Sequence, residues 1–104
     1  MNSMKWYNYL ACFFLGAFLI NSVPHIIHGI SGDSFPTPFA NPPGKGLSSP
    51  LINLLWGYFN LLMSYILYKF SKLNSQNKQA LASITAGIII MSFVLGITLA
   101  GKLS

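Results

Sequence analysis

Three long stretches without a charged residue decide what this chain of 104 residues can fold into. They are residues 6–23, 51–68 and 80–101. Each reaches the roughly 17–25 residues that an α-helix needs to cross a hydrocarbon core about 30 Å thick. Because a helix satisfies its own backbone hydrogen bonds in lipid, three transmembrane helices are predicted. The chain is then an all-α integral membrane protein with a single domain, residues 1–104, an outer loop at 24–50 and a cytoplasmic loop at 69–79.

The composition argues against both a soluble domain and a disordered chain. Charged residues make up 7% of the chain and hydrophobic residues 53%. A soluble domain carries about a quarter charged residues, and a disordered chain needs low hydrophobicity, so neither class fits. The first stretch lacks the small residues that precede a signal-peptide cleavage site, which favours an uncleaved anchor. Cys12, the single cysteine, rules out an intramolecular disulfide framework and is typical of a small buried thiol.

Lysine placement predicts the orientation. With three spans, the N-terminus and the 69–79 loop share one side of the membrane, which carries Lys5, Lys69, Lys72 and Lys78. The other side carries Lys45 and Lys102, partly offset by Asp33. Since cytoplasmic loops are enriched in lysine, the N-terminus is predicted to be cytoplasmic. The lysines are scattered and no arginine is present, so nucleic acid is not a predicted partner.

The second stretch carries a polar stripe at helical spacing, made of Asn53, Gly57, Asn60 and Ser64. Residues three or four apart lie on the same side of a helix. An amide facing lipid would leave donors and acceptors unpaired, so the stripe is predicted to face inward. Two interpretations stay open: the stripe holds helices together, or it lines a path for a small solute.

The third stretch carries small residues four apart, namely Ser92, Gly96 and Ala100. Ser83 and Gly87 form a second, shorter pair. Rows of this kind let two helix backbones approach closely, either within one chain or between chains. A homo-oligomer or a complex with another membrane protein is therefore expected, with the lipid bilayer as the common surroundings.

The outer connection contains all six prolines. Pro24 either ends the first helix or kinks it. If it only kinks the helix, the helix would continue for about two turns and end at Gly29 or Gly32. Residues 35–39 are predicted to be extended, because residues before proline avoid the helical region. Residues 41–44 are predicted to form a tight turn. Ser48 or Ser49 would cap the second helix, with Pro50 in its first turn.

Two histidines and the single carboxylate lie in or beside this connection. His25 and His28 share a helix face, and Asp33 follows five residues later. Such a set can bind zinc or a similar ion, and no other cofactor is predicted. Alternatively, the histidines hold the connection by hydrogen bonds to backbone carbonyls, or they respond to protons near neutral pH. No carboxylate pair, phosphate-binding loop or nucleophile elbow is present, so catalysis has the least support.

Residues 24–60 read PHIIHGISGDSFPTPFANPPGKGLSSPLINLLWGYFN. This segment resembles a family of small, uncharacterised bacterial membrane proteins with the core PHxxHGxxGxxFPTPFxxPPGxGxSSPxxNxxWGxxN. Shared features are the Pro-His start, the Phe-Pro-Thr-Pro-Phe centre, the Pro-Pro-Gly turn and the Ser-Ser-Pro start of an Asn…Trp-Gly helix. The resemblance implies a bacterial origin and hence the cytoplasmic (inner) membrane. It carries no established activity, so it transfers no functional residue.

Together these patterns predict a small multi-pass protein that acts as a binding or interaction component of the membrane. The alternative is an oligomeric transporter or channel for a small solute, lined by the polar side of the second helix. A membrane enzyme that uses His25, His28 and Asp33 is a third class, disfavoured because a pair of acid–base groups is missing.

Overall fold

The computed structural model describes residues 4–43 and 45–100, and over these residues the chain is helical with one short ladder. The helices are α1 (Trp6–Ile30), α2 (Pro50–Ser71) and α3 (Lys78–Ala100), and the strands are β1 (Phe35–Pro36) and β2 (Leu47–Ser48). All three helices are long and apolar enough to cross a membrane. At 1.5 Å per residue they measure about 33–38 Å. The prediction of three helices of this length and hydrophobicity is confirmed. The last residue of the third predicted stretch, residue 101, lies outside the described residues.

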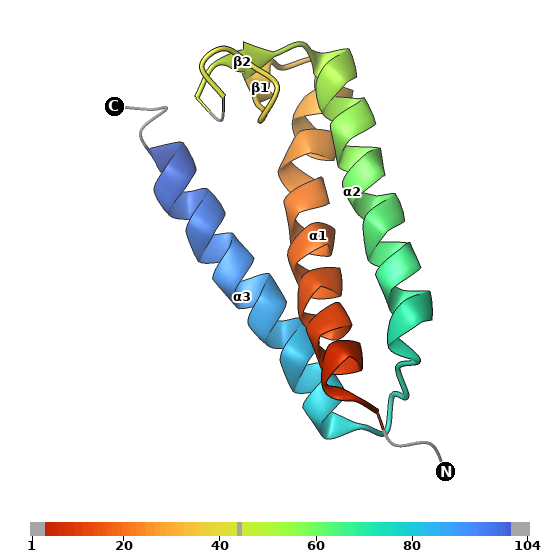
Figure 1. Cartoon of the computed structure of the whole chain (residues 1–104). Helices are drawn as coiled ribbons and strands as arrows, with labels where there is room; N and C mark the ends of the chain where they lie inside the picture. Colours follow the sequence, from red (N-terminus) through yellow and green to blue (C-terminus); the bar gives the residue numbers. More distant parts are fainter. Residues whose placement is uncertain (1–3, 44, 101–104) are drawn as a thin grey trace.

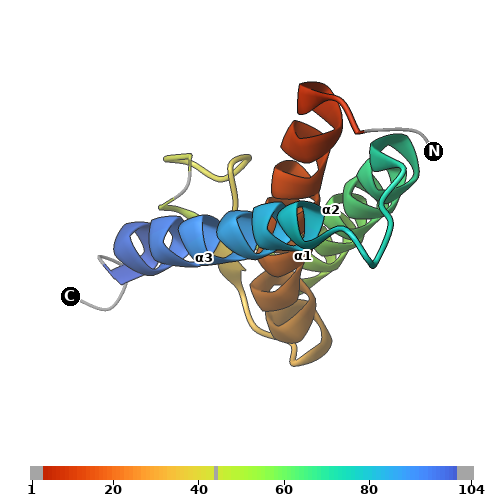
Figure 2. The ribbon, with the colours of Figure 1, turned by 90° about the horizontal axis from the view of Figure 1, so that it is seen from below.

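Helix α1 is the central element of the described chain. Both α2 and α3 pack along it and scarcely contact each other. Figure 1 shows α3 leaning away from α1 toward its C-terminal end, and Figure 2 shows the three helices from below. The start of α1 and the α2–α3 connection lie at one end of the molecule. The segment between α1 and α2, residues 31–49, which we call the cap, lies at the other end.

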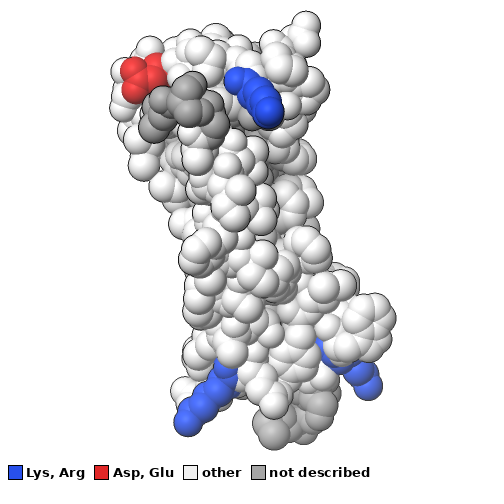
Figure 3. Space-filling view, turned by 90° about the vertical axis from the view of Figure 1, so that its left-hand side faces the viewer, with Lys and Arg blue, Asp and Glu red and all other residues white. Residues whose placement is uncertain are grey.

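The molecule is long and its charges lie at its two ends. Its principal extents are 49 × 24 × 20 Å, against about 40–45 Å for a bilayer with its headgroups. On the side shown in Figure 3, lysine and aspartate side chains gather at the two ends, and the band between them carries none. An uncharged belt of this kind is the pattern that a bilayer requires.

Helix α1 continues past Pro24 to Ile30, so the longer of the two predicted alternatives is correct. The last turns of α1 pack closely against α2. A Cβ on Gly29 would lie 2.5 Å from Leu54 Cγ, so the two helices touch here. The helix ends in a Schellman motif, in which Gly32 N–H donates to the Gly29 carbonyl and Asp33 N–H to the His28 carbonyl. Gly32 has φ +76°, a conformation that favours glycine.

The cap folds back as a short antiparallel ladder. Phe35 pairs with Ser48 and Pro36 with Leu47. The predicted extended segment 35–39 is therefore only partly extended, because a turn begins at Pro38. The Ser49 hydroxyl accepts from Ile52 N–H and caps α2, with Pro50 in the first turn as predicted. The turn predicted at 41–44 is found one residue later, since Lys45 N–H donates to the Pro42 carbonyl at 3.1 Å, and Gly44 lies outside the described residues.

Two glycines bring α1 and α3 into backbone contact. A Cβ on Gly16 would collide with the Ile84 carbonyl, and a Cβ on Gly87 would collide with the Phe13 carbonyl. Small residues at a helix crossing permit this close approach in the absence of a hydrophobic driving force. Beyond Gly87 the helices separate, and the second half of α3 is exposed. The shorter row of small residues, which contains Gly87, thus makes the contact within the chain.

Candidate functional site

The polar stripe of α2 faces α1, as its spacing predicts. Asn60 Oδ1 accepts from Asn21 Nδ2 at 2.9 Å, and Ser64 Oγ donates to the Leu15 carbonyl at 2.9 Å. A Cβ on Gly57 would lie 2.6 Å from Ile26 Cγ1, so this position also touches α1. Within one chain the stripe therefore holds two helices together, which is the first of its two interpretations.

Asn53, the first member of the stripe, connects both helices with the cap. It is fully buried. Its Nδ2 donates to the carbonyls of Phe35, Ser48 and Ser49 at 3.0–3.1 Å. Because Nδ2 faces three acceptors, Oδ1 is the atom that faces His25 Nδ1, at 2.7 Å. His25 thus donates from Nδ1, and the two hydrogens of Nδ2 are shared among three carbonyls, so one amide connects three different segments.

The structure separates the three residues proposed as metal ligands. His25 points inward to Asn53, whereas His28 Nδ1 lies 3.4 Å from Oδ2 of Asp33, an exposed side chain of the cap. The His28 ring stacks on Phe35 with ring centroids 4.1 Å apart, so packing also fixes its direction. Within the described residues, no three His, Cys, Asp or Glu side chains form a group that could hold a metal ion. The geometry is closer to the alternative in which the histidines hold the connection between the helices. Here His25 does so indirectly, through Asn53, which bonds to the backbone carbonyls of the cap.

Further hydrogen bonds fix the cap on itself. The hydroxyls of Thr37 and Ser48 lie 2.6 Å apart, and Phe39 N–H donates to Thr37 Oγ1 at 3.2 Å. Thr37 is 1% exposed, so this is an interior contact. The backbone at Phe39 is therefore anchored, while the Phe39 ring is 65% exposed and extends over α2. The cap consequently presents an aromatic side chain to the outer half of α2.

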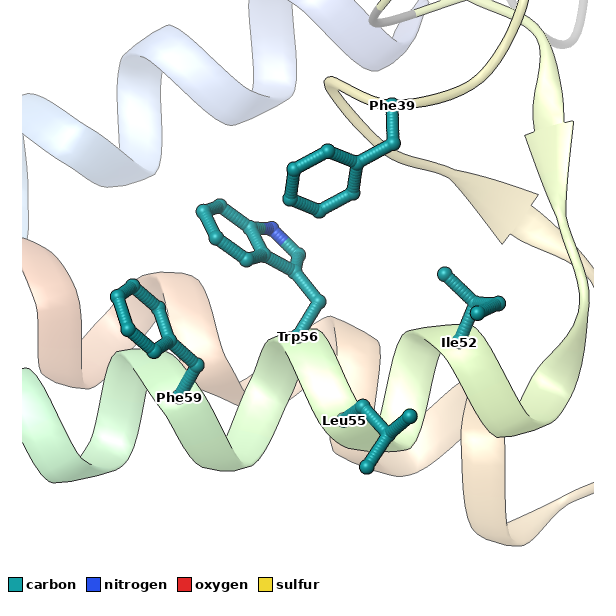
Figure 4. Close-up of a pocket in the computed structure, with 5 residues that line it drawn as sticks. All are labelled: Phe39, Ile52, Leu55, Trp56 and Phe59. Atoms are coloured by element: carbon teal, nitrogen blue, oxygen red, sulfur yellow. The ribbon is translucent and has the colours of Figure 1, made fainter.

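An apolar groove of about 490 Å³ lies under this ring. It is lined by Phe39, Ile52, Leu55, Trp56 and Phe59. Figure 4 shows the Phe39 ring hanging from the cap over Trp56, with Phe59 beside Trp56 along α2. Trp56 and Phe59 stack with centroids 5.6 Å apart. The volume falls within the about 300–1,000 Å³ of small-molecule sites.

The indole nitrogen of Trp56 is an unusual feature of this groove. Trp56 Nε1 is buried and has no hydrogen-bond partner among the described residues. The Phe39 ring covers it edge to face, with centroids 4.8 Å apart and an angle of 87°. An N–H group in apolar surroundings without an acceptor costs about 1–3 kcal/mol. Sequence reasoning missed this site, although Ile52, Trp56 and Phe59 share one helix face.

The row Ser92, Gly96 and Ala100 is not used within the described chain. All three residues are exposed. A Cβ on Gly96 would meet nothing within 4 Å. With Phe93 and Ile97 they line a shallow groove of about 430 Å³ on α3. The prediction gave two alternatives for this row, packing within one chain or between chains. The first is wrong, because α3 separates from α1 after Gly87. Packing between chains stays a prediction.

Comparison with protein-family models, with curated proteins and with solved structures finds no match to this chain. The resemblance of residues 24–60 to a family of bacterial membrane proteins thus stays a prediction. The described chain offers two surfaces for binding, the groove under the cap and the bare row on α3.

Proposed function

We propose that this protein is a binding component of the bacterial cytoplasmic membrane that joins another transmembrane helix through α3. The observation that carries this proposal is the bare row Ser92, Gly96 and Ala100. Only 11% of the most apolar window of α3 is buried, against 39% for α1. In lipid, a helix gains little from apolar area alone, whereas a groove lined by small residues allows close backbone contact. The partner helix belongs to a second copy or to a different membrane protein.

The location and orientation rest on charge and on the resemblance. Lys69, Lys72 and Lys78 surround the α2–α3 connection, at the same end as the start of α1. Asp33 and Lys45 lie in the cap at the opposite end. The lysine-rich end is then cytoplasmic and the cap faces outward. The bacterial assignment comes from the motifs of residues 24–60.

The polar stripe of α2 supports this binding role more than the alternative of a solute path. Asn53 and Asn60 are fully buried, and their hydrogen-bonding atoms have partners inside the chain. A path along the stripe would have to break these bonds, at about 1–3 kcal/mol for each buried group left unpaired.

Cysteine crosslinking in native membranes tests the proposed contact. The background is Cys12→Ala, and Ser92→Cys places one thiol in the row. The matched control is Val94→Cys, which lies about 3 Å along the axis on the opposite side of α3 and is also exposed. We expect an adduct from Ser92→Cys alone, whose mass tells a second copy from another protein. Gly96→Leu in the same chain should remove the adduct. Equal adducts from both thiols, or none from Ser92→Cys, would refute the proposal.

A further inference from the structure

The groove under the cap lies on a different helix from the proposed contact of α3 and has its own chemistry. Four of its lining residues come from the first ten positions of α2, and the fifth, Phe39, comes from the cap. No lining residue carries a charge. Trp56 lies six residues after the start of α2, which is about 9 Å along the axis. In a membrane this depth is just below the headgroups, where the ester groups and the first acyl carbons of lipids lie.

The buried indole nitrogen indicates what kind of occupant the groove requires. Trp56 Nε1 is buried and has no acceptor in the described chain, and the Phe39 ring that covers it keeps water from reaching it. A partner helix has its backbone carbonyls in its own hydrogen bonds, so only a polar side chain of that helix would offer an acceptor. A lipid offers both an acyl chain for the apolar walls and an ester carbonyl for the N–H. Charge also agrees, since an uncharged groove matches an ester and a hydrocarbon chain and makes no use of a headgroup charge.

The position of Phe39 explains how such an occupant could reach the nitrogen. The Phe39 backbone is held by the bond to Thr37, whereas its ring is 65% exposed. The ring can therefore rotate about its side-chain bonds without breaking that hydrogen bond. In the described conformation the Phe39 ring covers the Trp56 N–H, at the position where an acceptor atom of an occupant would lie.

We propose that this groove binds one acyl chain of an outer-leaflet phospholipid, whose ester carbonyl accepts a hydrogen bond from Trp56 Nε1 when Phe39 turns aside. The site is selective for the ester linkage, because the ester carbonyl is the group that reaches the N–H. A diether lipid has the same chains and headgroup but lacks this carbonyl. The proposal does not depend on the contact proposed for α3, but the choice of leaflet rests on the orientation proposed above.

Tryptophan fluorescence can test this selectivity, since the chain has two tryptophans, Trp6 and Trp56. The Trp6→Phe variant, with Trp56 alone, is placed in vesicles of diether phosphatidylcholine that contain a few per cent of brominated phosphatidylcholine as quencher. The quencher is either a diester or a diether with the same brominated chains. One hydrogen bond of about 1 kcal/mol corresponds to about a five-fold preference. We expect the diester to occupy the site about five times better, seen as stronger quenching at equal content.

The Trp56→Phe variant keeps Trp6 at the opposite end and should show equal quenching by both lipids. Phe39→Ala should increase the preference of Trp56 for the diester, because the covering ring is gone. Phe14→Ala is the matched control, since Phe14 is 43% exposed on α1, lines neither groove and should leave the preference unchanged. Circular dichroism checks that each variant keeps its helix content.

In one outcome, the diester and the diether quench Trp56 equally, to the extent expected from their share of the bilayer. That result would show ordinary contact with the bilayer and would overturn the proposal. Quenching below the bulk level with both would show that protein covers the groove, for example a second copy, and would also overturn it. An unchanged preference in Phe39→Ala would contradict the role given to the Phe39 ring.

Discussion

The imidazole of His25 donates a hydrogen bond of 2.7 Å from Nδ1 to Oδ1 of Asn53, and this bond joins α1 to α2 directly beneath the cap. The same asparagine holds the cap through the carbonyls of Phe35, Ser48 and Ser49. Buried networks of this kind are stable only when every member is satisfied. Asn53 therefore connects the cap with both helices, beside the ring contacts that Phe35 and Phe39 make with His28 and Trp56.

Replacing Asn53 with leucine is expected to release the cap. Leucine has the same branched shape but offers no acceptor to the His25 N–H and no donor to the carbonyls of the cap, at about 1–3 kcal/mol for each group that finds no other partner. The Ser49 carbonyl keeps its bond from the backbone N–H of residue 53. Asn53→Asp keeps an acceptor for His25 but sets a buried carboxylate oxygen against the same carbonyls, so it should release the cap as well. The measurement is tryptic cleavage after Lys45, an exposed residue of the cap. Cleavage after Lys72 is the internal control, and an equal increase at both sites would indicate general unfolding and contradict the prediction.

The glycines of α3 should respond differently to the same substitution. Gly87→Ala places a methyl group against the Phe13 carbonyl, and an overpacked contact typically costs about 1–3 kcal/mol. Gly96→Ala meets nothing within 4 Å, and its effect on stability should stay within about 0.5 kcal/mol. Unfolding of the two variants in mixed detergent micelles gives the comparison. Similar losses in both would mean that α3 does not cross α1 at Gly87.

The end of α1 depends on the conformation of Gly32. With φ +76° and no atom near the position of a Cβ, a side chain there is strained by the backbone and not by crowding. Gly32→Ala should cost about 1–2 kcal/mol in the same detergent assay. Gly32→Asn should cost less, because asparagine tolerates this region better. Ser34→Ala, in an exposed cap position, serves as the control; if alanine at position 32 is as mild as this control, the Schellman end is not formed.

Local patterns predicted most of the helical structure, because each depends on residues close in the sequence. The spacing of Asn53, Asn60 and Ser64 fixed one side of a helix, and burial of amides required that side to face a neighbour. The choice between Gly87 and Gly96 as the crossing point could not be predicted. Both lie in rows of small residues, and only the lean of α3 across α1 separates them.

The two features that sequence reasoning missed are contacts between distant segments. His25 and His28 share a helix face, yet the fold turns His25 toward Asn53 and leaves His28 near Asp33. The groove needs the Phe39 ring over Trp56, which depends on how the cap returns to α2. Patterns within a single helix carry no information on either arrangement, because both are set by tertiary packing.

The proposed orientation can be tested with two matched serines, one at each end of the molecule. Ser34 is exposed in the cap and Ser75 is exposed in the α2–α3 connection. In a Cys12→Ala background, Ser34→Cys should react with a thiol reagent that cannot cross the membrane when it is added to intact spheroplasts. Ser75→Cys should react only after the membrane is opened, since the lysines around it favour the cytoplasmic side. The reverse pattern would place the cap in the cytoplasm, and equal labelling of both in intact cells would argue against a spanning chain.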